Sequence, residues 1–342
     1  MHLTTAQSTT YQRILDPGSS AQAVRLSQDH VRALIHIAAR DLRLQGLPQP
    51  SGAVPDLFDN AFTSEFRLPG GDARELFAHA LSLNPEMETY VACLSTLHKT
   101  RLKYRQVLSS QPFATMDQVG PRALLQYQQL SNRSLAALLV WRKWLFDLDN
   151  RAAQDTGYLF EPVISAALGG VSYGPRSSPI RRSQDRAKGR QVDCILGDLA
   201  YEIKIRVTIA ASGQGRWGEE LSFPAEAQTA GFTPVLVVLD PTDNPKLVEL
   251  VRAFEAAKGK AYLGDAAWEH LKATTTPEMA IFLENYIHNP LDSVVGSLQD
   301  DEPLPELRLS ERRSSVRFQV GDDSWQVERR VARGAGVTDM DE

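Results

Sequence analysis

Two carboxylates and a lysine stand close together between Gly189 and Arg206, and they are the residue types that hydrolysis of a phosphodiester requires. Asp193 is followed nine residues later by Glu202, and Lys204 comes two residues after that. Carboxylate oxygens hold Mg²⁺ while leaving positions for water and phosphate, and the metal polarises phosphoryl oxygens and activates water. A lysine ammonium can stabilise the developing charge or act on the attacking water. The stretch therefore predicts a site at which Asp193 and Glu202 bind Mg²⁺ and Lys204 assists catalysis.

A β-hairpin is the element that we expect to bring these groups together. Val192 to Leu196 and Leu199 to Ile205 are extended, β-branched runs, and the two residues between them supply a glycine-containing turn. Since successive side chains on a strand point to opposite faces, Glu202 and Lys204 share a face. An ordinary ion pair on a solvated face is the alternative interpretation of this pair. The aspartate on the other strand favours a site.

The elements on either side of the hairpin supply the expected frame. Apolar residues recur at helical spacing from Gly157 to Leu168 and end at a double glycine, and Glu161 is the acid of this helix. Thr233 to Leu239 is an unbroken apolar run, which is typical of a buried central strand. We expect Glu161 to face the metal site. The alternative is a solvent-facing acid near the start of a helix, where the helix dipole favours it.

In this order, Glu161, Asp193, Glu202 and Lys204 resemble the PD-(D/E)xK nuclease superfamily. The wider segment from Gly157 to Trp268, with its Glu-Ile-Lys-Ile-Arg and Pro-Val-Leu-Val-Val-Leu-Asp-Pro runs, is similar to Type II restriction endonucleases, in particular ApaLI-like ones. The resemblance implies an α/β fold, a restriction-endonuclease-like mixed sheet flanked by helices, with a mostly helical N-terminal region. The proline that names the superfamily motif is missing, since valine precedes Asp193, but that position varies widely among these nucleases.

The resemblance also implies a function. Its members cleave double-stranded DNA at a short palindrome with Mg²⁺, leave 5′-phosphate ends and act in a restriction-modification system beside a cognate DNA methyltransferase. The ApaLI likeness implies a six-base site of the GTGCAC kind. A structure-directed or repair nuclease on the same core, and a non-catalytic DNA-binding protein, are the alternatives. The intact Asp193, Glu202 and Lys204 speak against the second of these.

A basic loop precedes the strand of Asp193. It holds six basic residues and a single acid, Asp185. The net charge of the chain is −5, so contact with a polyanion depends on such local clusters. We expect this loop to contact DNA phosphates, although a solvated basic loop has the same composition. The basic residues are Arg176, Arg181, Arg182, Arg186, Lys188 and Arg190.

A second loop, residues 208 to 217, leaves the strand of Lys204 and is our candidate for base recognition. Gln214 and Arg216 have the forked donors and acceptors that pair with adenine and guanine edges. Glycines 213 and 215 let the backbone approach DNA closely. A flexible surface loop anchored by a buried Trp217 is the alternative. A palindrome presents the same half-site twice, which predicts a homodimer.

Composition and pattern set the class of protein and its expected division. The chain has 342 residues, 42% hydrophobic and 23% charged, as in ordinary globular proteins. No apolar run approaches the roughly 18 residues of a membrane span, and we expect a cytoplasmic protein. We expect an irregular N-terminal arm (1–22), a helical region (23–150), a PD-(D/E)xK nuclease core (151–290), and a C-terminal extension (291–342) with a hairpin and a disordered tail.

Overall fold

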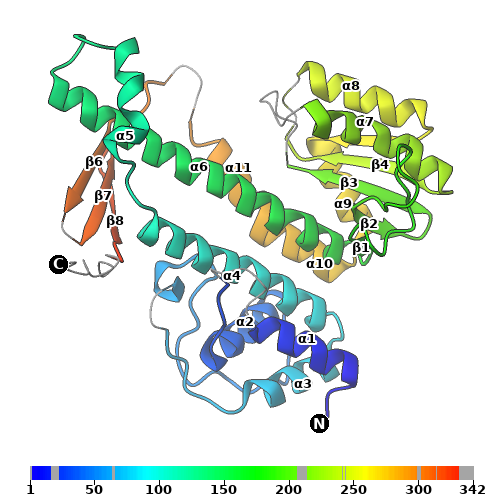
Figure 1. Ribbon diagram of the computed structural model, residues 1–342. Helices are drawn as coiled ribbons and strands as arrows, with labels where there is room; N and C mark the ends of the chain where they lie inside the picture. The colour runs from blue at the N-terminus through cyan, green and yellow to red at the C-terminus, as the bar shows by residue number, and fades with distance from the viewer. Residues whose placement is uncertain are drawn as a thin grey trace, which may run out of the picture. The chain divides into compact units, whose positions relative to one another are not determined.

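The chain divides into two compact units in our computed structural model (Figure 1). The first unit comprises Met1–Gly18, Arg25–His98 and Gly157–Val295, and the second Ser19–Val24, Lys99–Thr156 and Gly296–Glu342. The expected boundaries at 150 and 290 do not coincide with the edges of these units, because helices α4 (Met87–Ser110) and α6 (Asn132–Ala167) each contribute to both. The structure describes residues 2–16, 23–63, 66–205, 214–240, 242, 244–298, 302–312 and 314–330.

A five-stranded mixed sheet forms the centre of the first unit. Its strand order is β1-β2-β3-β4-β5; the first three strands pair antiparallel, and β3, β4 and β5 pair parallel. The predicted hairpin is confirmed: Leu196 pairs with Leu199 across a turn in which Gly197 has φ 60°. The strands are β1 (Val171–Tyr173), β2 (Val192–Leu196), β3 (Leu199–Lys204), β4 (Thr233–Val238) and β5 (Lys260–Leu263).

Helices cover both faces of this sheet (Figure 1). On one face α7 (Gln214–Thr229) and α8 (Pro245–Ala256) bury Phe223 and Phe254 against Ala200, Leu236 and Val238 of the strands. On the other, the Tyr201 hydroxyl lies 3.2 Å from Nε2 of His270, on α9 (Asp265–Thr274). Because β4 is buried on both faces, it reads as an unbroken apolar run rather than an alternating one. The predicted restriction-endonuclease-like mixed sheet is confirmed.

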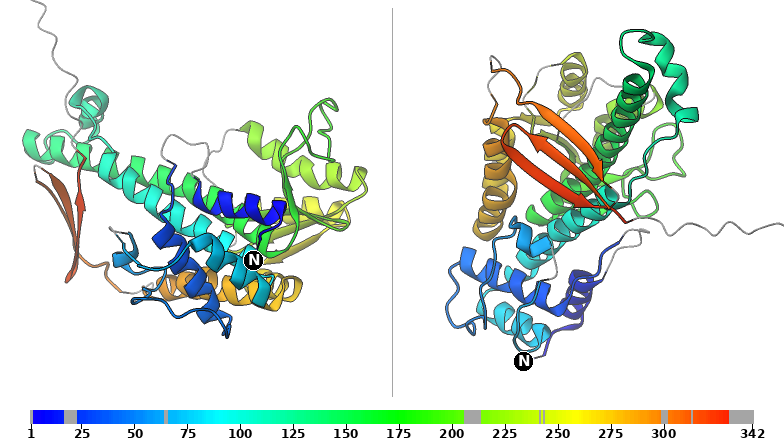
Figure 2. Two further views of the ribbon diagram at one scale, coloured as in Figure 1. Left: turned by 90° about the horizontal axis from the view of Figure 1, so that it is seen from below. Right: turned by 90° about the vertical axis from the view of Figure 1, so that its left-hand side faces the viewer.

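The rest of the first unit is helical, as expected for most of the N-terminal part (Figure 2). The Tyr90 hydroxyl donates to Asp41 at 3.0 Å, and Tyr286 donates to the same carboxylate, which ties helices from both ends of the unit together. These elements are α1 (Thr5–Leu15), α2 (Gln28–Asp41), the 3-10 helix η1 (Asn60–Thr63), α3 (Ala73–Leu83), α10 (Pro277–Leu283), a π-helix (Glu284–His288) and α11 (Asn289–Val295).

The expectation of an irregular arm at residues 1–22 is wrong for its central part, which is helix α1. Thr4 caps this helix: its side chain accepts from the Gln7 N–H, and the Gln7 side chain accepts from the Thr4 N–H. Tyr11, Ile14 and Leu15 are buried on one face. The Ser, Thr and Gln content of the segment hid this short apolar stripe.

The second unit holds the remaining elements. In the expected helical region, a 3-10 helix that contains Pro121 ends at Leu125, and α6 begins only at Asn132. The predicted C-terminal hairpin is present, and a third strand, β6, pairs with it. Within the described ranges, none of the helices has the length and apolar character that crossing a membrane requires. The elements are α5 (Met116–Val119), η2 (Gly120–Leu125), β6 (Leu307–Arg312), β7 (Ser315–Val320) and β8 (Asp323–Glu328).

Gly170→Ala is expected to destabilise the folded protein. A Cβ at this position would lie 2.2 Å from Cys194 Sγ and 2.8 Å from the carbonyl oxygen of Ile195, and that carbonyl cannot move without β2. Overpacking of this kind costs about 1–3 kcal/mol, which urea unfolding measures. Gly174→Ala is the matched control, because a Cβ there has nothing within 4 Å. Equal unfolding midpoints for the two variants would contradict the close approach of β1 and β2.

Candidate active site

Asp193 lies where the paired part of the hairpin ends. Cys194 and Tyr201 form the last pair between β2 and β3, and beyond it the Ile203 N–H donates to Asp193 Oδ2 at 2.8 Å. The side chain thus accepts a bond that a strand carbonyl would otherwise take. Asp193 is only 8% exposed. The opening of the hairpin therefore fixes one carboxylate oxygen inside the protein.

Glu202 and Lys204 lie on the same face of β3, as predicted. Lys204 Nζ is 3.0 Å from Glu202 Oε1 and 3.5 Å from Oε2 of Glu220, which belongs to α7. The exposed fractions of the Lys204 and Glu202 side chains are 17% and 18%, so the pair is not an ordinary one on a solvated face. Burial acts to lower the pKa of Lys204, but Glu202 and Glu220 outweigh it and raise that pKa above its ordinary value. Sequence reasoning missed Glu220.

Three carboxylates act on one another at this site. Burial raises the pKa of Asp193 well above its usual value, and the charges of Glu202 and Glu161 raise it further. Burial likewise raises the pKa of Glu161, with a further contribution from Glu202, while Lys204 opposes the rise. The structure therefore brings together all four residues that the sequence predicted. Glu161 precedes Pro162, a proline inside α6.

This donor set fits a hard divalent cation. Carboxylate oxygens are the ligands that Mg²⁺ prefers, and it is commonly bound through one or two of them together with waters and substrate phosphates. Within the described ranges, no group of three or more His, Cys, Asp or Glu side chains is arranged to hold a metal ion. The chemistry of Asp193 and Glu202, two shielded carboxylates beside one lysine, fits an ion that takes its other ligands from water and substrate. Glu161 and Asp193 line one pocket of about 270 Å³, together with Tyr158, Tyr173 and Gln191.

The basic loop folds back on itself before β2. Arg181 and Gly189 form an isolated bridge, and the Ser183 N–H and hydroxyl donate to Glu226 Oε1 of α7 at 2.7 and 2.8 Å. Gly189 is required here, because a Cβ would lie 2.1 Å from the carbonyl oxygen of Pro175. Glu226, which sequence reasoning also missed, therefore anchors the loop.

Arg190 departs from the expectation for this loop. It is 8% exposed, its Nη1 lies 3.3 Å from Glu226 Oε2, and its guanidinium packs over Phe223. A residue held in this way supports the loop from inside and is not placed to contact DNA phosphates. The sequence could not show this, because the partner lies on a helix that begins many residues later.

The other basic residues of the loop remain near the surface. Arg182 pairs with Glu219 at 2.6 Å and Lys188 with Asp185 at 3.1 Å. The remaining three are exposed and have no ion-pair partner in the described part of the chain; they are Arg176, Arg181 and Arg186. A pocket of about 440 Å³ has Arg176, Arg181, Arg182 and Lys188 in its wall and no acidic side chain.

The expected loop of residues 208–217 is wrong for its last four residues, which begin helix α7 at Gln214. Most of its other residues lie outside the described part of the chain, as do the side chains of Gln214 and Arg216. Its last residue, Trp217, is described: Nε1 donates to Glu249 Oε2 at 3.1 Å, and the Lys246 ammonium lies 5.1 Å from the ring centroid. Trp217 thus fixes the start of α7 on α8. Base recognition by this loop stays a prediction.

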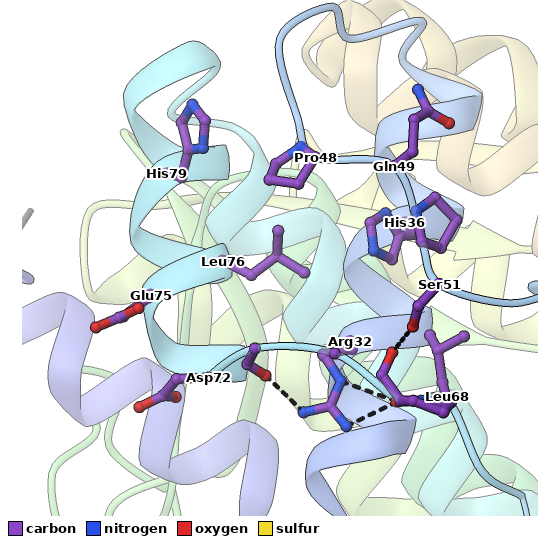
Figure 3. A pocket seen from close by; sticks show the side chains of 14 residues that line it. Arg32, His36, Pro48, Gln49, Ser51, Leu68, Asp72, Glu75, Leu76 and His79 are labelled. Atoms are coloured by element: carbon purple, nitrogen blue, oxygen red, sulfur yellow. Dashed lines mark hydrogen bonds between the residues drawn. The ribbon is translucent and has the colours of Figure 1, made fainter.

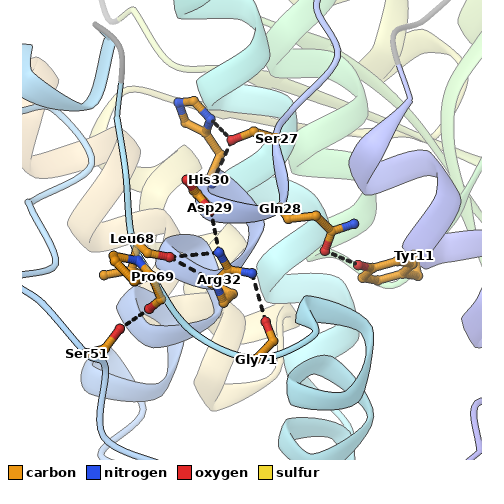
Figure 4. Close-up of polar contacts among 10 residues, drawn as sticks. All are labelled: Tyr11, Ser27, Gln28, Asp29, His30, Arg32, Ser51, Leu68, Pro69 and Gly71. Atoms are coloured by element: carbon orange, nitrogen blue, oxygen red, sulfur yellow. Dashed lines mark hydrogen bonds and ion pairs between the residues drawn. The ribbon is translucent and has the colours of Figure 1, made fainter.

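Another pocket, of about 360 Å³, lies among α2, α3 and the loops beside them (Figure 3). Its central cation, Arg32, donates to the carbonyl oxygens of Leu68 and Gly71 and pairs with Asp29 (Figure 4). Its donors are therefore used to hold the loop before α3. None of the residues that line this pocket belongs to the acidic cluster. The role of Arg32 in holding the loop explains why an arginine lies there.

The family model for ApaLI-like restriction endonucleases matches residues 72–288, which is more than half of the chain. The chain belongs to this ApaLI-like family. The match contains Glu161, Asp193, Glu202 and Lys204 together with the whole basic loop, whereas α1, α2 and the β6–β8 sheet fall outside it. Membership thus confirms the ApaLI-like resemblance drawn from the sequence.

A curated relative supports the same assignment. The Type II restriction enzyme ApaLI of Acetobacter pasteurianus is 51% identical over 229 residues, which are 65% of this chain and 61% of that enzyme. The chain therefore spans about three fifths of the length of this relative. No solved structure matches.

Asp193→Asn is expected to stabilise the protein in metal-free buffer at neutral pH. Because the folded pKa of Asp193 is raised, stability is lost as pH rises from the unfolded pKa to the folded one, and a neutral amide avoids this loss. The amide oxygen can still accept from the Ile203 N–H. Thermal unfolding in EDTA should show Tm higher by about 2–4 °C for each kcal/mol of repulsion removed. A lower Tm would contradict the electrostatic account of the cluster.

Proposed function

We propose that this protein is a Type II restriction endonuclease, a hydrolase that cuts both strands of DNA at a short palindrome and leaves 5′-phosphate ends. The half-buried cluster of Asp193, Glu202 and Lys204 at the opening of the hairpin carries this proposal. Membership in the ApaLI-like family supports it. The likeness to a Type II restriction enzyme supports a role in a restriction-modification system. The finer proposal of a site of the GTGCAC kind rests on the resemblance drawn from the sequence.

The proposed cofactor is Mg²⁺, held by Asp193 and Glu202. When bound, such an ion polarises phosphoryl oxygens and lowers the pKa of water. The hydrogen bond from the Ile203 N–H keeps the Asp193 carboxylate in one orientation. The raised pKa of Lys204 keeps its side chain a charged donor, so its role is to hold a phosphate oxygen or orient the attacking water rather than to remove a proton. Glu161 lines a pocket together with Asp193, where it can face a bound ion or a water molecule.

The basic loop is the proposed contact with the DNA backbone. Its pocket with four basic side chains offers several donors to one phosphate group, which suits binding that does not depend on sequence. Arg190 is left out of this role because it is buried. Gln214 and Arg216 stay our candidates for contacts with base edges.

The proposed assembly is a homodimer on a palindromic site. One active site cuts one strand, and a two-fold protein matches a site with two equal halves. Large exposed apolar side chains support association: Leu124, Leu125 and Tyr127 are 80%, 82% and 57% exposed. A cognate DNA methyltransferase is the proposed functional partner, because it would protect the host's own sites. Such a pair would work in the cytoplasm.

Asp193→Ala and Lys204→Ala are each expected to bind DNA but to cut it at least roughly 100-fold more slowly than the unaltered protein, because each removes a group at the reacting phosphate. The measurement is digestion of a plasmid of known sequence with Mg²⁺, followed by mapping of the ends. Gel shifts in EDTA report binding separately. Cleavage by either variant at the unaltered rate would remove the assignment of the site.

Substituting Arg176 and Arg181 together by alanine is expected to weaken binding to all DNA sequences alike. Both side chains are exposed, lack an ion pair in the described part of the chain and line the basic pocket. Each lost phosphate contact should flatten the slope of log affinity against log salt by about one unit. Arg13→Ala, on α1 outside the family match, is the matched control. A change in the preferred cleavage sequence would show instead that the loop reads bases.

A further inference from the structure

Lys204 has two carboxylate partners from different elements. Glu202, two residues away on β3, lies 3.0 Å from the ammonium, and Glu220 on α7 lies 3.5 Å from it. All three side chains are mostly shielded, with exposed fractions of 17% for Lys204, 18% for Glu202 and 26% for Glu220. Shielding makes such contacts stronger than they would be at the surface. Glu220 is thus a neighbour of the reacting lysine with no role in the proposed reaction.

The two partners differ in what else they must do. Glu202 is one of the two carboxylates proposed to hold the metal, so a bound ion would compete with Lys204 for its oxygens. Lys204 carries its charge on a flexible four-carbon side chain. Without a second partner, only Glu202 would hold its ammonium, and the ammonium would shift whenever Glu202 shifts. Glu220 supplies a fixed acceptor that is not required as a metal ligand.

The start of α7 is held firmly enough for Glu220 to serve in this way. Trp217 donates to Glu249 on α8 at 3.1 Å, and Glu219 pairs with Arg182 of the basic loop at 2.6 Å. Phe223, one turn further, is fully buried in the core between α7 and the sheet. Since adjacent helix residues do not face the same way, Glu219 points to the loop while Glu220 points to Lys204.

We propose that Glu220 is a positioning residue that holds the Lys204 ammonium in place for the phosphate while Glu202 serves the metal. This inference rests on the proposed function, because it gives Lys204 a part in cleavage. Glu220 acts through Lys204 and touches neither substrate nor metal.

The first test compares Glu220→Ala and Glu220→Gln in single-turnover cleavage of a plasmid whose cut site has been mapped. The alanine variant is expected to cleave roughly 10- to 100-fold more slowly, the size of loss that a misplaced group causes, with DNA affinity in EDTA unchanged. The glutamine variant keeps an acceptor oxygen for the ammonium, so its loss should be smaller. Glu255→Ala, an exposed acid on α8, is the charge-matched control and should cleave normally.

The second test separates positioning from metal binding without relying on cleavage. Mg²⁺ that binds the folded protein raises its Tm, and this rise is measured in Lys204→Ala with and without Glu220→Ala. If Glu220 acts only through the lysine, the Mg²⁺-dependent rise is the same in both proteins. Loss of the rise in the double variant would make Glu220 a metal ligand and overturn the proposal.

Two further outcomes would also overturn it. Cleavage by Glu220→Ala within about 2-fold of the unaltered rate would show that the lysine needs no second partner. Equal losses of rate in the alanine and glutamine variants, together with equally lowered Tm, would show that Glu220 only supports the fold. The Lys204→Ala variant separates the two proposals. If it is inactive while either outcome above is found, the role of Glu220 is wrong and the role of Lys204 stands. If it cleaves normally, the proposed role of Lys204 is itself wrong.

Discussion

Carboxylates that repel one another lie together at the open end of the hairpin of β2 and β3, and the packing of the first unit must hold them there. Asp193, Glu202 and Glu161 are drawn from a strand, its neighbour and a helix, and burial together with mutual repulsion raises the pKa of two of them. Such a group persists only where the surrounding packing holds it. The sheet core around Ala200, Leu236 and Phe223, buried between strands and helices, provides that packing.

A divalent cation would convert this unfavourable cluster into a favourable one. Among the described residues, Lys204 is the ammonium that faces the carboxylates, and the charges of Glu202 and Glu161 oppose ionisation of Asp193. A bound ion would add positive charge where the Ile203 N–H already orients one carboxylate, so little reorganisation would accompany binding. Repulsion without an ion and affinity for an ion would then have one physical cause, as in the usual conflict between stability and activity.

Local signals in the sequence were enough for the hairpin and for the acidic cluster. Alternation on both strands, a glycine at the turn and Glu-x-Lys spacing depend on neighbours only a few residues away, and the structure places Asp193, Glu202 and Lys204 together accordingly. Arg190 shows where this information ends. By its position in the sequence Arg190 belongs to the basic loop, but its burial depends on Glu226 of α7, whose packing against the loop the sequence pattern does not show. The sequence did not predict Glu220 as a partner of Lys204 for the same reason, since the two residues meet only when α7 packs on the sheet.

Helix α7 places the basic loop and Lys204 relative to one another. Glu219 pairs with Arg182 and Glu226 accepts from Ser183, so two acids seven residues apart, on one face of the helix, hold the loop. Glu220, the residue beside the first of them, reaches Lys204. A rigid helix with a buried Phe223 fixes such distances better than flexible connections would. If the loop holds a DNA phosphate, the same helix therefore sets where the scissile phosphate must lie relative to Lys204, and a displacement of α7 would disturb DNA binding and cleavage together.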